Sequence, residues 1–263
     1  MAKIHRKTAA TSQSWDGVAD WYAGWSGARG SFHHRKVAIP TVMDLLRCRA
    51  GESVIDLGCG PGALASAVAQ AGARYTGVDL SRKLIRFARK HNQSRQADFQ
   101  VGDLTDADLA RTLGPARFDA AVFLLSLQDI HPMSAAIANA AAILRPGGRL
   151  VILMTHPCFR IPRQSGWGWD GGRKLQYRRV DHYLSPLQVP MQPHQGTGGI
   201  TRSYHWPLSS YVSELSAQGL MIDQLQEIPM TRLPKEQSVS RAEKRALREI
   251  PLFLALRAQK LSG

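Results

Sequence analysis

Three aspartates and three glycines in the first half of the chain have types and spacings that suit nucleotide binding. Asp56 lies at the end of a short apolar segment, Asp79 ends a second segment about 20 residues later, and Asp103 follows a third. Glycines alternate with other residues directly after Asp56: Gly58, Gly60 and Gly62. Because glycine lacks a Cβ, such a turn can approach a ligand closely. The pattern predicts strand, tight turn, helix and strand, with the acids at the carboxyl edge of a parallel sheet.

The acids favour a cationic nucleoside over a pyrophosphate. Gly58, Gly60 and Ala63 also satisfy the dinucleotide fingerprint, so the glycines alone leave both ligands open. Asp56 would present an uncompensated negative charge to a pyrophosphate, whereas an ammonium or sulfonium would be attracted. Asp79 has the spacing of an acid that takes ribose hydroxyls. We expect Asp103 to accept from an exocyclic adenine amine.

These motifs resemble the class I S-adenosylmethionine (SAM) dependent methyltransferases, a Rossmann-like family, and within it the type 11/25-like members. Asp56 and the three glycines match the family's first motif, and residues 118–127 and 144–152 are similar to its fourth strand and its turn into the fifth. The resemblance implies SAM as cofactor and in-line methyl transfer with S-adenosylhomocysteine as product. It also implies a set of cofactor-binding residues: Asp56, Gly58, Cys59, Gly60, Gly62, Asp79, Leu80, Gly102, Asp103, Leu104, Leu125 and Tyr22.

Strand and helix patterns alternate through the core and predict an α/β, doubly wound, mostly parallel sheet. The expected strands are 53–57, 74–79, 97–101, 119–125 and 149–154, and the expected helices are 62–71, 81–92, 106–113 and 134–144. A helix at 208–218 and strands at 221–228 and 250–257 bring the count to the family's seven strands, of which the last enters antiparallel. We expect four parts: an N-terminal arm and lid helix (1–36), the SAM-binding core (37–154), an inserted cap after the fifth strand (155–206), and the rest of the core sheet (207–263).

The cap is predicted to bind the methyl acceptor. About fifty residues without a long periodic pattern are usually functional in a compact domain, and aromatic residues gather there. The expected acceptor-binding residues are Arg160, Trp167, Trp169 and Tyr183. The alternative is a structural β-hairpin extension. In the lid, Trp21 and Tyr22 are expected to cover the cofactor or to pack on the core.

Methyl transfer to a hydroxyl or ammonium group benefits from a base near the methyl group. His156 is the first candidate because it directly follows the fifth strand. Asp129 and His131, after the fourth strand, come next, and Tyr177 in the cap is a further candidate. Each of these can instead be a structural hydrogen-bonding residue. Of the adjacent His33 and His34, one is left as a candidate for contact with substrate or cofactor.

Two other methyl-transfer chemistries are disfavoured. Pro157 and Cys158 resemble the nucleophile of pyrimidine C5 methyltransferases, but that pair follows a different strand or comes with a second cysteine motif. Enzymes that methylate amino groups of nucleic acids carry an acid or Asn before Pro-Pro-aromatic after the fourth strand. This chain has Leu125 to Asp129 there. A member of the fold without methyl-transfer activity remains a further alternative.

Composition limits the class of protein and its partners. The chain has 263 residues, is 44% hydrophobic and has a formal net charge of +14 at pH 7. No apolar run is long enough for a membrane span, and the basic start lacks a secretory pattern. Three widely spaced cysteines predict neither a disulfide framework nor a metal site, and fit a cytoplasmic protein.

Positive charge gathers in the N-terminal arm, in 160–179 and in 241–248. This charge suits RNA, an anionic small acceptor or a solvated surface. We expect a small-molecule acceptor, anionic or aromatic, ahead of nucleic acid. The patterns do not distinguish a monomer from a homodimer.

Overall fold

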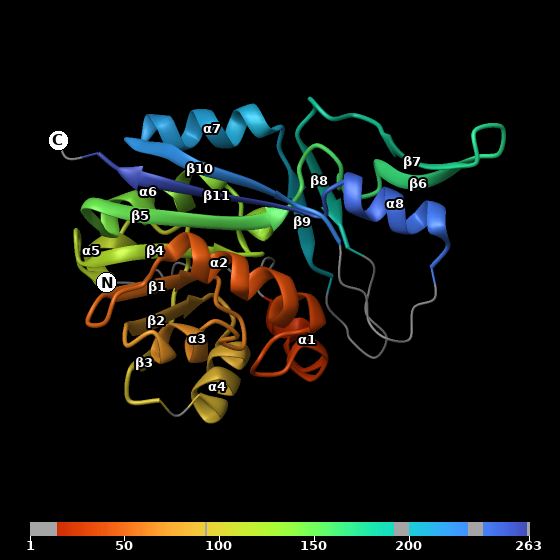
Figure 1. Cartoon of the computed structure of the whole chain (residues 1–263). Coiled ribbons are helices and arrows are strands. Elements are labelled where there is room, and N and C mark those ends of the chain that lie inside the picture. Colours follow the sequence, from red (N-terminus) through yellow and green to blue (C-terminus); the bar gives the residue numbers. More distant parts are fainter. Residues whose placement is uncertain (1–14, 93, 192–199, 231–238, 262–263) are drawn as a thin grey trace, which may run out of the picture.

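The computed structural model describes residues 15–92, 94–191, 200–230 and 239–261 (Figure 1). Seven strands form one sheet in the order β10-β11-β5-β4-β1-β2-β3. Their bounds are β1 Ser53–Leu57, β2 Arg74–Asp79, β3 Ala97–Val101, β4 Phe118–Leu124, β5 Leu144–Thr155, β10 Leu220–Ile228 and β11 Phe253–Lys260. The basic arm expected at the N-terminus lies in residues 1–14, outside the described part.

The first five strands run parallel, and β11 lies antiparallel between β5 and β10. Each crossover between parallel neighbours contains helical structure, as such connections require. The predicted doubly wound sheet of seven strands, with an antiparallel last strand, is therefore confirmed. This order places the carboxyl ends of β1, β2 and β3 side by side, where the three predicted acids can meet.

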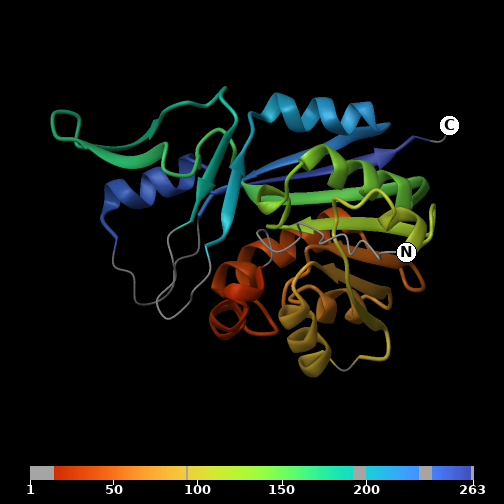
Figure 2. The same ribbon diagram turned by 180° about the vertical axis from the view of Figure 1, so that it is seen from behind.

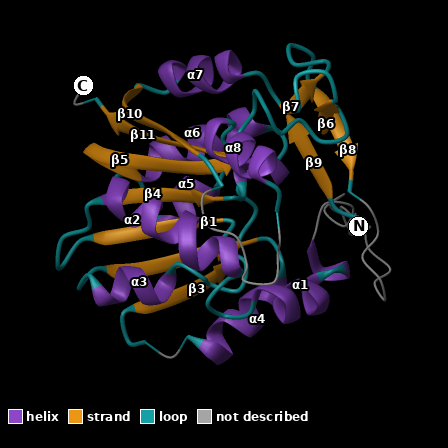
Figure 3. Ribbon diagram, turned by 45° about the vertical axis from the view of Figure 1, so that its right-hand side comes forward, coloured by secondary structure: helices purple, strands orange, loops and turns teal. Residues whose placement is uncertain are grey.

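Helices cover both faces of the sheet (Figure 3). Their bounds are α1 Ala19–Ser26, α2 Ile39–Leu46, α3 Ala65–Gln70, α4 Arg82–His91, α5 Leu109–Leu113, α6 Met133–Ile143, α7 Leu208–Ala217 and α8 Arg241–Glu249. One buried cluster joins α2, α3 and α4 to one face, and a second joins α5, α6 and α7 to the other. Alternate residues of a strand enter different clusters: Val54 packs with the first and Ile55 with the second.

The helix after β1 begins later than predicted. Gly62 has a φ of 82°, and Gly62 N donates to Cys59 O, so the chain makes a tight turn before the helix begins. The regular helix α3 therefore starts at Ala65. Residues 58–64 remain a loop at the carboxyl end of β1.

The cap consists of two separate two-stranded sheets. Strands β6 (Ser165–Asp170) and β7 (Leu175–Val180) form one hairpin, and β8 (Leu187–Pro190) pairs with β9 (Arg202–His205). Figures 1 and 2 show both beyond the carboxyl end of β5, with α8 beside β7. The described part of the insertion, expected to be structureless, thus contains two antiparallel strand pairs. Within the described residues, no helix combines the length and apolar character needed to cross a bilayer.

Candidate functional site

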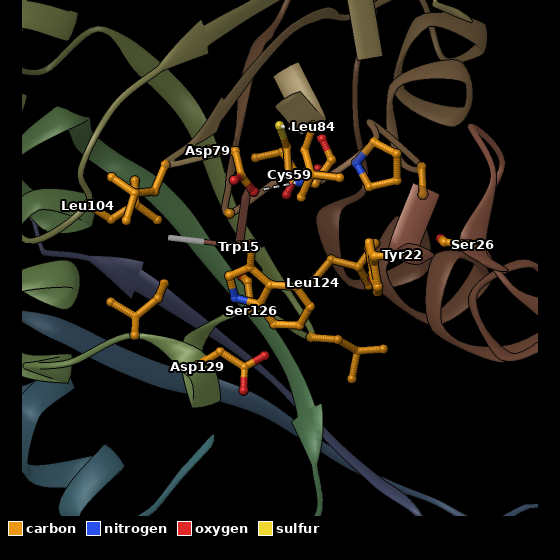
Figure 4. A pocket seen from close by; sticks show the side chains of 18 of the residues that line it. Trp15, Tyr22, Ser26, Cys59, Asp79, Leu84, Leu104, Leu124, Ser126 and Asp129 are labelled. Carbon is orange, nitrogen blue, oxygen red and sulfur yellow. Dashed lines mark hydrogen bonds between the residues drawn. The ribbon is translucent and has the colours of Figure 1, made fainter. Parts of the chain in front are cut away.

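A pocket of about 940 Å³, partly open to solvent, lies at the carboxyl ends of β1, β2 and β4 and under α1 (Figure 4). This volume includes the space that is open to solvent at the mouth of the pocket. Ten of the twelve residues predicted to bind the cofactor line it: Tyr22, Asp56, Gly58, Cys59, Gly60, Asp79, Leu80, Asp103, Leu104 and Leu125. The structure therefore brings together most of a set that spans about two fifths of the chain.

The glycine loop after β1 forms the floor of the pocket. Gly58 and Gly60 have φ values of 76° and 52°, conformations that favour glycine. A Cβ on Gly58 would lie 2.6 Å from Ser126 Cβ, so the loop after β4 can approach only because residue 58 has no side chain. Ser126 Oγ in turn donates to Leu57 O at 2.6 Å. These contacts join the ends of β1 and β4 into one wall.

Asp56 is the most deeply buried acid of the pocket, with a residue exposure of 1%. Tyr75 OH donates to its Oδ2 at 2.8 Å. Within the described part of the chain, its Oδ1 has no hydrogen-bond partner. Burial raises the pKa of Asp56 to about 7, opposed by the Tyr75 hydrogen bond and assisted by the charge of Asp79. A buried acceptor of this kind needs a donor, preferably a positive one.

Asp79 and Asp103 are held by neighbouring backbone groups. Asp79 accepts from Gly60 N and from Ser81 N, both at 2.8 Å, so it fixes the glycine loop. Burial raises the pKa of Asp79, while these two backbone donors lower it. Asp103 Oδ1 accepts from Thr105 N and Thr105 Oγ1 at 2.8 and 2.7 Å. Both carboxylates keep lone pairs for ligand donors.

The arrangement fits SAM. Its ammonium and sulfonium would compensate the buried charge at Asp56, and its ribose hydroxyls and adenine amine are donors for carboxylates such as Asp79 and Asp103. The unpartnered Asp56 Oδ1 supports this fit most directly, because an ammonium offers it both a hydrogen-bond donor and a positive charge, whereas an anionic group would meet like charge.

The lid begins with the short helix η1 (Trp15–Gly17) and continues into α1. Trp15 and Tyr22 line the pocket, whereas Trp21 stacks on Trp25 with centroids 6.0 Å apart. Burial raises the pKa of Tyr22 to about 12, so its hydroxyl stays protonated at neutral pH. Of the two expected covering aromatics, Tyr22 is thus in place and Trp21 is not. Residues four apart share a helix face, and this pairs Trp21 with Trp25 and Tyr22 with Ser26.

The lid is fixed to α4 by Asp16. Ser81 Oγ donates to Asp16 Oδ1 at 2.5 Å, and Lys83 N donates to the same oxygen at 3.1 Å. An acid at a helix N-terminus is stabilised by the free backbone N–H groups there. The contact holds η1 and α1 over the pocket.

Two of the four candidate catalytic residues reach the pocket, Asp129 and His131. Asp129 ends the short helix η3 (Leu127–Asp129), and burial raises its pKa to about 7, opposed by a hydrogen bond with Ser203. The His131 ring stacks on Tyr204 of β9, with centroids 4.8 Å apart and planes at 14°. This corner of the pocket combines an acid that titrates near neutrality with a flat aromatic wall.

His156, the first candidate base, lies elsewhere. It follows β5 as expected, but its Nε2 pairs with Glu227 Oε1 of β10 at 2.9 Å, and its Nδ1 accepts from Cys158 N at 3.2 Å. The sheet order explains the correction: β10 is two strands beyond β5, on the side away from β4. His156 is not among the residues that line the pocket, and both ring nitrogens already have partners.

The cap residues predicted to bind the acceptor also lie outside the pocket. The guanidinium groups of Arg160 and Arg178 each lie over the ring of Trp167, 5.2 Å from its centroid. Arg160 donates to the carbonyl groups of Ile250 and Pro251. These contacts attach the β6–β7 hairpin to the end of α8.

The remaining cap candidates have structural neighbours or face solvent. Tyr183 OH accepts from Leu208 N at 3.0 Å and lies 3.4 Å from Cys158 Sγ. Trp169 is 54% exposed, and Tyr177 is 44% exposed with its ring close to Gly168. None of them lines the pocket.

Gly62 and Gly102, predicted at the cofactor, are beside the pocket rather than in its lining. A Cβ on Gly62 would lie 2.7 Å from the Phe99 ring, and one on Gly102 would lie 2.9 Å from Val78. Both glycines therefore allow close packing of the core behind the loops.

Sequence reasoning missed several lining residues, among them Trp15, Ser26, Thr105 and Ser126, and left His34 only as one of two candidates. Ser126 could have been predicted from the sequence, because it directly follows the fourth strand. Ser26 could have been found from its spacing of four from Tyr22. The described lining contains four aspartates and neither lysine nor arginine, which the overall charge of +14 does not suggest.

Comparison with known families finds a match within the core. Residues 55–152 match the family model of the methyltransferase domain. A demethylmenaquinone methyltransferase of Tropheryma whipplei is 35% identical over 114 residues, which cover 43% of this chain and 46% of the relative. A ubiquinone biosynthesis O-methyltransferase of Xylella fastidiosa is 36% identical over 142 residues, covering 52% and 56%. The chain spans about half the length of these relatives.

A solved structure shows the same fold over a larger part of the chain. The crystal structure of an S-adenosylmethionine dependent methyltransferase from Mesorhizobium loti superimposes with a TM-score of 0.69 at 24% identity. It covers 89% of this chain and 100% of that one. The resemblance to class I methyltransferases is therefore confirmed, in sequence for residues 55–152 and in fold for most of the chain.

Proposed function

We propose that this chain, whose residues 55–152 form a methyltransferase domain of the class I fold, transfers the methyl group of SAM to a hydroxyl group of a small molecule. The observation that carries the proposal is the buried carboxylate of Asp56, whose Oδ1 has no partner within the described residues. Asp56 lines a pocket with three further aspartates. Such a site selects a positively charged ligand over a phosphate-bearing one.

The residues that would hold the cofactor follow from the site. Asp56 would take the ammonium, Asp79 the ribose hydroxyls, and Asp103 with Leu104 the adenine, while Tyr22 and Trp15 exclude water from above. When bound, SAM supplies an already activated methyl group on sulfur. The protein then needs mainly to orient the acceptor and remove its proton.

Asp129 is the base that fits the site best. Its pKa of about 7 means that the carboxylate and the carboxylic acid are both populated near neutrality, which suits general base catalysis. In the proposed reaction, Asp129 accepts the proton of the acceptor hydroxyl. His131, stacked on Tyr204, offers a flat surface for a planar acceptor. The word "O-methyltransferase" in the name of the Xylella relative agrees with a hydroxyl acceptor.

The pocket argues against an anionic acceptor and against RNA. A carboxylate or phosphate near Asp56 and Asp129 would meet like charge, and the described lining offers no lysine or arginine to compensate. Arg160, expected to bind the acceptor, donates instead to the carbonyl groups of Ile250 and Pro251. Neither quinone-pathway relative named above is described as acting on RNA.

Calorimetric titration with S-adenosylhomocysteine (SAH) tests the cofactor assignment. We expect the wild-type chain to bind it and Asp79→Ala to bind at least tenfold more weakly, the loss of a charged hydrogen bond. Asp170→Ala in the cap is the control and should bind as the wild type does. Binding of a nicotinamide dinucleotide with no response to SAH would overturn the proposal.

A panel of phenols and enols, assayed for SAH release, tests the chemistry. For an accepted substrate, Asp129→Asn should lower kcat by about 100-fold or more, the size of a general-base contribution, and leave SAH affinity nearly unchanged. The wild-type kcat should rise with pH up to about 7, because the deprotonated carboxylate is the active form. An unchanged kcat in the variant would remove Asp129 from this role.

A further inference from the structure

One corner of the pocket contains two polar side chains, Ser26 and His34, to which the proposed cofactor contacts of the acids give no role. Ser26, at the end of α1, is 4% exposed and lines the pocket. Its Oγ is buried and has no partner of hydrogen-bond geometry within the described residues, although the Tyr22 side chain is close enough to interact with it. A buried hydroxyl without a partner is unfavourable unless a ligand completes it.

His34 is the second polar group of this corner. It begins the π-helical turn η2 (His34–Ala38), is 7% exposed and lines the pocket. Its Nδ1 is hydrogen-bonded to Ser31 Oγ at 2.9 Å, which leaves Nε2 as the ring nitrogen available to a ligand. Burial lowers the pKa of His34 to about 4, assisted by the charges of His33 and Arg35. The ring is therefore neutral at physiological pH, and its two nitrogens share one hydrogen.

The backbone is built to bring His34 to this position. Gly30 has a φ of 76°, and a Cβ there would lie 2.5 Å from His34 Cβ and 3.3 Å from Ala63 Cβ. His34 thus lies against the loop that follows β1, where the amino-acid part of a nucleoside cofactor would be. Figure 4 shows Ser26 and Tyr22 on one side of the pocket and Leu104 on the opposite side, with Asp79 between them.

The charge around this corner differs from that of the rest of the pocket. Arg35 donates to Gly30 O beside His34, whereas Asp56, Asp79 and Asp129 belong to the walls beyond. A zwitterionic amino acid would place its ammonium at Asp56 and its carboxylate away from the acids. Of the lining residues on that side, Ser26 and His34 have hydrogen-bond donors to offer, and the charges that act on His34 are those of His33 and Arg35.

We infer that Ser26 and His34 bind the carboxylate of the cofactor's amino-acid moiety, Ser26 through its hydroxyl and His34 through Nε2–H. The inference rests on the proposed function and adds residues to it. It requires that Ser31 Oγ donate to His34 Nδ1, so that the ring hydrogen stands on Nε2. The lid then binds the amino-acid end of the cofactor, which adenosine lacks.

Three probes separate the parts of the ligand. SAH carries both the ammonium and the carboxylate, decarboxylated SAH keeps only the ammonium, and 5′-methylthioadenosine carries neither. Calorimetry on the full chain would compare the wild type with Ser26→Ala, His34→Leu and His34→Gln, which keeps a side-chain donor. Ser216→Ala on the exposed side of α7 is the matched control.

We expect Ser26→Ala and His34→Leu each to lower SAH affinity on the order of tenfold, and to leave the affinities for decarboxylated SAH and 5′-methylthioadenosine unchanged. His34→Gln should recover part of the loss. Thermal unfolding of each variant checks that the fold is retained. If His34→Leu unfolds, Ser26→Ala still tests the inference, because it removes very little volume.

Three results would overturn the inference. Equal weakening of 5′-methylthioadenosine would mean that these residues only support the lid. Equal weakening of decarboxylated SAH would mean that they bind the ammonium. Unchanged SAH affinity would mean that they bind neither group. A wild-type chain that binds none of the probes refutes the proposed function itself, which distinguishes that failure from a failure at Ser26 and His34.

Discussion

The pocket at the sheet edge and the cap beyond β5 differ in whether protein groups satisfy their charged side chains. In the pocket, Asp56 is buried with one oxygen unpartnered within the described residues. In the cap, Arg178 donates to Phe159 O and Ser165 Oγ and lies against Trp167. A buried charge that lacks a partner indicates a ligand, whereas a cation satisfied by carbonyl groups and an aromatic ring stabilises structure. The residue types in both regions suggest a functional site. Only their contacts distinguish the two regions: an oxygen of Asp56 lacks a partner within the described residues, whereas Arg178 is satisfied by protein groups.

The largest difference between the regions should appear when their glycines are changed. Gly58→Ala forces a side chain at a φ of 76° and against Ser126 Cβ, so we expect at least a 100-fold loss of SAH affinity, about 3 kcal/mol. Gly166→Ala, on β6, meets no atom within 4 Å and should bind SAH as the wild type does. Calorimetry measures both, and circular dichroism checks the fold.

A second substitution sharpens the test of Gly58. Ser126→Gly, combined with Gly58→Ala, removes the contacted Cβ and should recover part of the affinity, while the backbone strain remains. If Gly58→Ala alone bound SAH normally, the glycine loop would not form the floor of the cofactor site.

The next effect concerns Asp56, whose substitution should have opposite consequences for binding and for stability. Asp56→Asn removes the charge offered to the cofactor, so SAM affinity should fall about 10- to 100-fold, in the range of a charged hydrogen bond. The same change should stabilise the unliganded protein above neutral pH, because the buried carboxylate no longer has to ionise. Asp170→Asn on the cap hairpin is the control and should change neither quantity.

The sign of the pH effect follows from the raised pKa. Burial raises the pKa of Asp56 from 3.8 to about 7, so between these values the folded state binds more protons than the unfolded state. The free energy of unfolding therefore falls as pH rises through this window, by up to about 4 kcal/mol if the shift is fully realised. The melting temperature of Asp56→Asn minus that of the wild type should grow from pH 5 to pH 8. A difference independent of pH would contradict the burial of an ionising carboxylate.

How well the sequence predicts each region depends on the range of the contacts that define it. Asp56, Gly58 and Gly60 lie within a few residues of one another, and local spacing predicts their meeting at the strand end. His156 was misplaced because its partner, Glu227, is on β10, and only the sheet order shows that this strand lies on the far side of β5. The acceptor role of the cap aromatics stays a prediction for the same reason: composition reveals that they gather, but not that the guanidinium groups of Arg160 and Arg178 lie over the Trp167 ring.

A smaller effect, on stability alone, is expected from Trp167→Leu. The substitution removes the ring over which Arg160 and Arg178 lie and should lower the free energy of unfolding by about 1 to 2 kcal/mol, the size of partly desolvated cation–π contacts. SAH affinity should not change, because Trp167 is not in the pocket lining. Thermal unfolding and calorimetry on the same sample separate the two quantities. A loss of SAH affinity with intact stability would show that the hairpin contributes to the cofactor site.

The smallest effect is expected at Trp169, and it bears most directly on whether the cap binds the acceptor. Trp169 is 54% exposed on β6, and surface substitutions away from special contacts change stability by about 0.5 kcal/mol or less. Trp169→Ala should therefore leave the melting temperature, SAH affinity and kcat/KM within error, whereas Asp129→Asn should lower kcat. If Trp169→Ala instead raised KM for an accepted substrate at unchanged stability, the hairpin would reach the acceptor during turnover. In that case the cap would bind the acceptor, as its aromatic composition predicts. The contrast between the cap and the pocket would then hold only for the protein without its ligands.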